Sequence, residues 1–100
     1  MDKDSSMKAV ATLVHKIVIE LTGGTEGIRY DADLERVEDA LGAASVIAFD
    51  HPFVDGNKRT AYIMWKLSKV YGQWTWTEFE GLVEKLVEED REWMDILARI

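Results

Sequence analysis

The fold is decided by the stretch His51-Pro52-Phe53-Val54-Asp55-Gly56-Asn57-Lys58-Arg59-Thr60 and by the apolar residues that follow it. Pro52 disfavours helical geometry at the residue before it, so a helix arriving from the amino-terminal side is expected to stop at Asp50-His51-Pro52. A new helix is predicted over 57–71 and ends before Gly72. Its apolar residues lie on nearly all sides, which places this helix at the centre of a bundle. They are Ala61, Ile63, Met64, Trp65, Leu67, Val70 and Tyr71.

Apolar residues at helical spacing predict further helices on both sides of the central one. The first covers 7–21 and is ended by Gly23-Gly24. Asp31 is the expected N-cap of a second segment, whose apolar stripe continues to Ala48 and which stops at Asp50-His51-Pro52. Gly42 interrupts that segment and favours two short helices over one.

The carboxyl-terminal part of the chain predicts one more helix. Thr77-Glu78-Phe79-Glu80 has the pattern of a capping box. Trp74-Thr75-Trp76 alternates before it and could form a short extended piece. The inward face of the helix comprises Phe79, Leu82, Val83, Leu86 and Val87, and Trp93, Ile96 and Leu97 could continue that face. The chain is therefore expected to be a small all-α bundle of four or five helices, with residues 1–100 in a single domain.

Composition excludes several classes of function. Hydrophobic residues make up 47% of the 100 residues and charged residues 31%, a balance typical of a globular domain. There is no cysteine, which excludes disulfides and thiol catalysis, and the two histidines are too few for a multi-histidine metal site. The net charge of −7 argues against direct nucleic-acid binding. The polar start and the short apolar runs predict a cytoplasmic protein without a membrane partner.

Positive charge is concentrated next to the predicted loop. Residues 51–70 carry a net charge of +3, although the whole chain carries −7. The backbone N–H groups of Lys58, Arg59 and Thr60 would be unpaired at the start of the helix, where an anion, above all a phosphate, is favoured. Cations at this end oppose the helix dipole, and a bound polyphosphate would resolve that conflict.

The same segment holds the residue types that phosphoryl or nucleotidyl transfer requires. His51 could take a proton from a hydroxyl, and Asp55 could hold Mg²⁺. Gly56 would let the backbone approach a ligand, and Phe53 would fix the loop to the core.

Structural alternatives remain open for each residue. Asp-Gly is a common turn pair, and His51 could be an ordinary loop histidine. Lys58 and Arg59 could form a solvated basic turn. His15 lies off the main apolar stripe of its helix and is expected to face solvent or to bond locally. The tryptophans favour packing, although an exposed pair would indicate an interface, and a homodimer is credible for such a small core.

The residue order from His51 to Thr60 resembles the signature of the Fic/Doc family, in which fixed His, Phe, acidic, small, Asn and Arg positions follow one another at this spacing. The stretch Gly23-Gly24-Thr25-Glu26-Gly27-Ile28-Arg29 is also similar to one that is common in the Doc branch. The resemblance covers about residues 8–72. Lys58 and Tyr62 stand where the family's adenylyltransferases usually have Gly and a second Arg. Both departures favour the Doc branch, the death-on-curing toxins of toxin–antitoxin pairs.

This resemblance implies a Fic/Doc-like fold with a phosphate-binding loop before the central helix. It implies a kinase that transfers the terminal phosphate of ATP to a protein hydroxyl, a threonine of elongation factor Tu, and so blocks translation. His51 would be the general base, Asp55 the Mg²⁺ ligand and Phe53 structural. The phosphates would lie on Gly56, Asn57, Lys58 and Arg59. An antitoxin protein would be the inhibitory partner.

Two other functions stay open. One is a Fic-type protein adenylyltransferase, which Lys58 and the missing second Arg disfavour. The other is a non-catalytic member of the family that acts as a binding module. Doc-like chains have more sequence between the Gly-Gly loop and the signature, whereas here about twenty residues join Arg29 to His51. That shortening favours the binding module.

Overall fold

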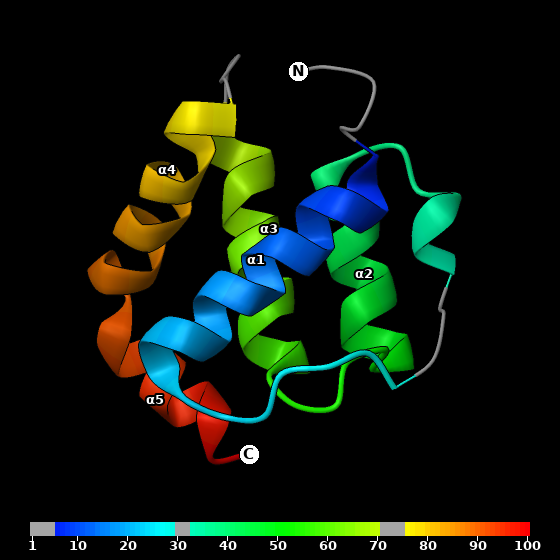
Figure 1. Cartoon of the computed structure of the whole chain (residues 1–100). Helices are drawn as coiled ribbons and strands as arrows, with labels where there is room; N and C mark the ends of the chain where they lie inside the picture. Colours follow the sequence, from blue (N-terminus) through cyan, green and yellow to red (C-terminus); the bar gives the residue numbers. More distant parts are fainter. Residues whose placement is uncertain (1–5, 30–32, 71–75) are drawn as a thin grey trace.

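The structure of the chain, a computed structural model, describes residues 6–29, 33–70 and 76–100 (Figure 1). Within these ranges it forms five α-helices and one 3₁₀ helix, and no β-strand beyond an isolated bridge between Ile28 and Phe53. The elements are α1 (Met7–Thr22), η1 (Asp33–Glu35), α2 (Ala40–Asp50), α3 (Asn57–Val70), α4 (Trp76–Glu89) and α5 (Arg91–Ala98). The expected all-α class is confirmed. None of these helices is long and apolar enough to cross a bilayer.

Helix α3 occupies the centre of the bundle, as the sequence predicts. It contacts α1, α2, α4 and α5, and α1 crosses in front of it in Figure 1. Ile63, Met64 and Leu67 are buried and belong to the same core cluster as Val14 of α1. The opposite side of α3 lies at the surface, where Trp65 is exposed. The central helix therefore has one face that no other described element covers completely.

Helix α1 begins and ends where the sequence predicts. The Ser6 hydroxyl accepts a hydrogen bond from the Ala9 amide, which satisfies one of the free donors of the first turn. Gly23 follows the last residue with φ of +90°, a conformation that favours glycine, and its N–H donates to the carbonyl of Ile19.

The second segment divides into two short helices, as expected, but not at Gly42. The break lies between η1 and α2, and Asp39 is the N-cap of α2, with its carboxylate accepting from the Gly42 amide at 2.7 Å. Gly42 is thus part of the first turn of α2. The expected cap, Asp31, lies outside the described residues. Helix α2 ends at Asp50, and its C-cap His51 has left-handed geometry with φ of +52° before Pro52.

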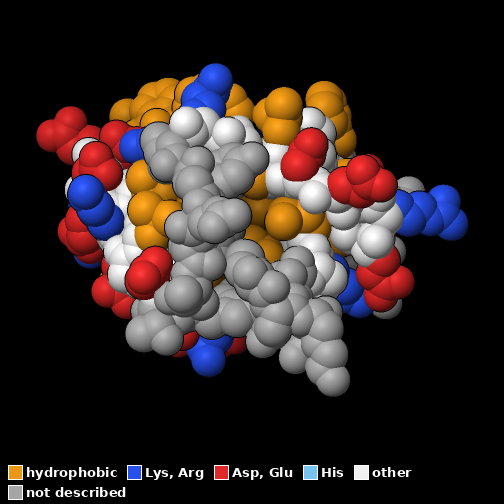
Figure 2. Space-filling view, turned by 90° about the horizontal axis from the view of Figure 1, so that it is seen from above, with side chains coloured by type: hydrophobic (Ala, Val, Ile, Leu, Met, Phe, Trp, Pro, Cys, Tyr) orange, Lys and Arg blue, Asp and Glu red, His pale blue; other side chains and the backbone are white. Residues whose placement is uncertain are grey.

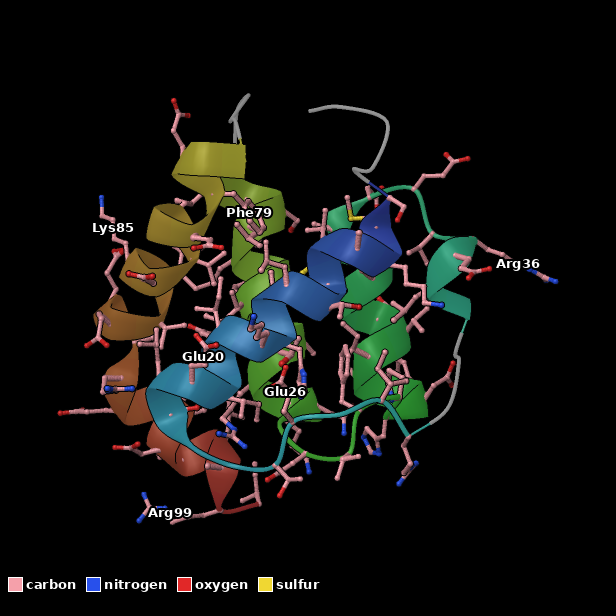
Figure 3. All side chains as sticks on the ribbon, viewed as in Figure 1. Glu20, Glu26, Arg36, Phe79, Lys85 and Arg99 are labelled. Atoms are coloured by element: carbon pink, nitrogen blue, oxygen red, sulfur yellow. The ribbon has the colours of Figure 1, made fainter. Side chains whose placement is uncertain are left out.

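The last segment differs from the expectation in two places. Helix α4 begins at Trp76, so Thr77 lies inside the helix rather than at its N-cap position. Of the expected extended piece, Trp76 is helical, and Trp74 and Thr75 lie outside the described residues. The chain then turns at Asp90 into α5, which buries Met94 while Trp93 and Ile96 stay exposed. The inward face of α4 is confirmed by buried Phe79, which Figure 3 shows between α4 and α3.

The turn at Asp90 is fixed by contacts with the central helix. Tyr62 donates its hydroxyl hydrogen to the Asp90 carboxylate at 2.8 Å, and Lys66 donates to the same oxygen. The Lys66 hydrogen bond lowers the pKa of Asp90. Arg91 of α5 donates to the carbonyl of Leu21 in α1. These contacts hold the start of α5 against α3 and α1, so α4 cannot continue in a straight line.

The capping role of Asp39 can be tested by substitution. We expect Asp39→Ala to lower the free energy of unfolding by about 1 kcal/mol, because the Gly42 amide loses its acceptor. Urea denaturation measures this loss. Glu38→Ala is the matched control, since it removes an adjacent exposed carboxylate that does not cap the helix. Equal losses in the two variants would contradict the assignment.

Candidate functional site

The loop 51–56 is packed against α1 through two aromatic rings. Phe53 is buried and lies flat on His15, with ring centroids 3.9 Å apart and planes 4° from parallel. His15 Nε2 lies 2.7 Å from the carbonyl oxygen of Asp55. Because a carbonyl can only accept, Nε2 must carry the proton and donate it. Phe53 therefore packs the loop against the core, and His15 provides its partner.

His15 is a residue whose role the sequence interpretation missed. Its place off the apolar stripe predicts a side chain that faces solvent or bonds locally, but its exposed fraction is 2% and its partner lies in the loop before α3. Burial lowers the pKa of His15. The spacing did contain a signal: Ala11 and Val18, which stand four residues before and three after it, are both buried on the same face.

Arg59 lies inside the protein and joins α1 to the loop. Its exposed fraction is 3%. Nη1 donates to the Thr22 hydroxyl at 2.7 Å and to the Gly23 carbonyl at 2.8 Å, and Nη2 lies 3.4 Å from Asp55 Oδ1. The alternative of a solvated basic turn is therefore wrong for Arg59. Its guanidinium satisfies the carboxyl-terminal end of α1, a place where cations are favoured.

The carboxylate of Asp55 is shared by two loops. Oδ1 accepts from the Gly56 amide at 2.8 Å, and Oδ2 accepts from the Thr25 amide at 3.2 Å. A Cβ added to Gly24 would lie 2.6 Å from Oδ2, so only glycine lets the Gly-Gly loop pass this close. Nearly half of the Asp55 side chain, 47%, is still exposed. Among the described residues no group of three or more His, Asp or Glu side chains forms a metal site.

Asn57 and Gly56 also shape the loop. The Asn57 amide accepts from the Phe53 N–H and donates to the Phe53 carbonyl, both at 2.9 Å. Gly56 has φ of +75°, and a Cβ there would lie 2.9 Å from Cδ1 of Ile19. The positive φ and the close packing on α1 both favour glycine here, and Gly56 also lines the pocket described below.

A small polar pocket of about 130 Å³ lies at the start of α3. It brings together the predicted site residues of the loop, His51 and Asp55 to Arg59, with Val54. The end of α5 and the residues after it complete the lining with Leu97, Ala98 and Ile100. The sequence did not indicate these residues, because their position depends on the turn at Asp90. Lys58 is exposed and donates from Nζ to the Ile100 carbonyl at 2.9 Å. The imidazole of His51 makes no hydrogen bond with the described part of the chain.

The free amides of α3 lie one residue earlier than expected. The Thr60 N–H donates to the Gly56 carbonyl at 2.9 Å, which closes the first turn. The amides that the helix leaves unpaired are therefore those of Asn57, Lys58 and Arg59, whose residues all line the pocket. Together with the Lys58 ammonium, this helix end provides donors and positive charge suited to an anion.

Comparison with known proteins leaves the site to be interpreted from its geometry. No protein-family model, no curated protein and no solved structure matches the chain. Four kinds of group surround one pocket: the His51 imidazole, which has no hydrogen bond to the described residues, the Lys58 ammonium, the free amides of residues 57–59 and the half-exposed Asp55 carboxylate.

The burial of His15 makes stability depend on pH. Its pKa is lowered from the ordinary value of 6.5. Below that pH the unfolded chain therefore binds a proton that the folded imidazole does not bind. We expect the free energy of unfolding to fall as the pH drops from 7 to 5. The fall approaches about 1.4 kcal/mol for each pKa unit by which the folded imidazole lies below the unfolded one. His15→Gln, whose amide can still donate to the Asp55 carbonyl, should show a smaller fall.

Urea denaturation at several pH values measures this dependence. Asp90, whose pKa is lowered from 3.8, stabilises the fold above that value and loses its effect only in more acidic solution, so the two ranges are separate. An unchanged slope between pH 7 and 5 in His15→Gln would contradict the interpretation.

The inward position of Arg59 predicts a large effect on stability. Arg59→Met should lower the free energy of unfolding by about 2–4 kcal/mol, because the Thr22 hydroxyl, the Gly23 carbonyl and the Asp55 carboxylate lose a charged donor. Lys58→Met also replaces a cationic side chain by methionine, at the adjacent exposed position. It should lower the free energy of unfolding by less than about 0.5 kcal/mol. Similar losses in the two variants, measured by chemical denaturation, would show that Arg59 does not join α1 to the loop.

Proposed function

We propose that the chain is a Doc-like protein kinase, which transfers the terminal phosphate of ATP to a hydroxyl of a protein target. The observation that carries this proposal is the convergence of His51, Lys58 and the unpaired amides of residues 57–59 on one pocket. A threonine of elongation factor Tu is the target that the sequence resemblance suggests, and an antitoxin is the inhibitory partner it suggests. Modification of that factor would block translation.

The start of α3 supports phosphate binding. Phosphates are favoured at helix amino termini, where free N–H groups and the helix dipole act together. Lys58 adds a full charge at the same point. Its ammonium donates to the exposed O atom of Ile100, which a phosphate oxygen could replace. Arg59 would contribute chiefly through its backbone amide, because its guanidinium is occupied within the protein.

His51 is the candidate general base. Its imidazole lines the pocket and is not held by another described side chain. In the proposed reaction it takes the proton of the target hydroxyl while that oxygen forms a bond to the terminal phosphorus of ATP. The bond from this phosphorus to the bridging oxygen breaks, and ADP leaves.

Asp55 is the residue that would hold Mg²⁺. Magnesium is commonly bound by one or two carboxylates together with the phosphates of the substrate, and the Asp55 side chain is half-exposed beside the pocket. When bound, the ion would neutralise charge on the phosphates. Arg59 and the Thr25 amide hold the same carboxylate in a fixed orientation.

Two observations bear on the alternatives. Tyr62 occupies the position where an adenylyltransferase would have its second Arg, and its hydroxyl is committed to Asp90, which disfavours AMP transfer. Conversely, the side chains of Asp55, Asn57 and Arg59 all have partners within the protein, which favours a non-catalytic binding module as the second candidate.

Mass spectrometry of elongation factor Tu after incubation with the protein and Mg²⁺-ATP tests the kinase. We expect phosphate on one threonine and a rate about 10²–10⁴-fold lower with His51→Asn, because the general base is lost. Asparagine tolerates the left-handed backbone of this position, so the loop should keep its shape.

Asp50→Asn is the matched control, since this neighbouring residue does not line the pocket. An AMP adduct would instead identify an adenylyltransferase. Absence of both modification and ATP binding would favour the binding module over either enzyme. ATP binding without modification would point to a different protein target.

A further inference from the structure

We propose that the protein forms a homodimer through an apolar groove on the exposed side of α3. The groove, about 410 Å³ in volume, has α3 as its floor and α2 and α5 as its walls. This inference is independent of the proposed function. The residues of the groove that carry the argument are Leu41, Ala48, Phe49, Trp65 and Trp93.

Large hydrophobic side chains are exposed together at this groove. Phe49 is 85% exposed, Leu41 53%, Trp93 43% and Trp65 41%. They come from three different helices that the fold brings to one side, and in the view from above hydrophobic side chains gather along the upper edge, away from α1 (Figure 2). Single exposed hydrophobic residues are normal in a monomer, whereas a contiguous patch marks an interaction site.

The exposed apolar area approaches what a dimer needs. A whole aromatic side chain can bury about 150–250 Å². At the exposures given above, the three aromatic residues and Leu41 offer on the order of 300–500 Å² of apolar surface per copy. A standard interface buries about 800 Å² per partner, of which about 56–58% is apolar. The groove thus supplies most of the apolar share of one interface.

The shape of this face suits a second copy of the same chain. Phe49 projects from α2, while Ala44, Ser45, Ala48 and Ala61 leave a recess beside it. In a twofold pairing, each copy can insert its Phe49 into the recess of the other. Such an isologous contact closes on itself and forms a defined dimer. Aromatic side chains seated in a recess are typical of interface hot spots.

Charge also favours this occupant. Lysines of α3 stand at the groove: Lys58 lines it, and Lys69 lies 4.9 Å from the Trp65 ring centroid. Because an isologous contact places the same face of each copy against the other, these lysines can meet acidic residues on the α5 wall of the second copy. Glu92 and Asp95 are exposed on α5, the wall that supplies Trp93.

Sedimentation equilibrium on the whole chain tests the proposal. We expect the wild type to reach twice the monomer mass of 11.4 kDa at concentrations below about 1 mM, and Phe49→Ser to weaken dimerisation at least tenfold, about the loss seen when a hot-spot residue is truncated. Trp65→Glu, on a different helix of the groove, should also weaken it. Far-UV circular dichroism verifies that each variant is folded.

Ile28→Ser is the matched control, because Ile28 is 48% exposed but lies outside the groove, and this variant should dimerise as the wild type does. A wild type that stays monomeric up to that concentration would overturn the proposal. So would a dimer that Phe49→Ser and Trp65→Glu leave unchanged, since its interface would then lie on another face.

Discussion

The buried guanidinium of Arg59 is the interaction on which the site depends. It reaches from the first turn of α3 to the last turn of α1, where it bonds Thr22 and Gly23, and it faces the carboxylate of Asp55 on its other side. A charge so deeply buried is tolerated only when its donors are satisfied. The end of α1, the Gly-Gly loop and the start of α3 are therefore fixed relative to one another, and the pocket takes its shape from this arrangement.

The signature segment divides into residues that build the loop and residues that face the pocket. Phe53 packs on His15, Gly56 packs on Ile19, and Asn57 bonds the backbone of Phe53. The side chains of His51 and Lys58 do not hold the loop together, and both line the pocket. Several residues of this segment are thus explained by the geometry of the loop. The chemistry that we propose falls mainly on two side chains and three backbone amides.

The sequence predicted the all-α bundle, the central helix and the end of α2 because these depend on local signals: helical spacing of apolar residues, Gly23 and Pro52. The sequence also indicated the segment from His51 to Arg59, most of whose residues line one pocket. It could not predict the inward direction of Arg59, the role of His15 or the closing of the pocket by α5, since each depends on contacts between segments far apart in the chain. The cap of α2 at Asp39 depends on where the turn before this helix falls.

The proposed kinase depends on binding of nucleotide phosphates at the start of α3. Amide-resolved NMR during titration with Mg²⁺-ATP is the sharpest test of this binding, because it reports on each backbone N–H separately. We expect saturable shifts of the amides of Asn57, Lys58 and Arg59, which line the pocket, and little change at Lys69 in the last turn of the same helix. Absence of shifts at residues 57–59, or shifts that saturate only elsewhere in the chain, would rule out phosphate binding at this helix end.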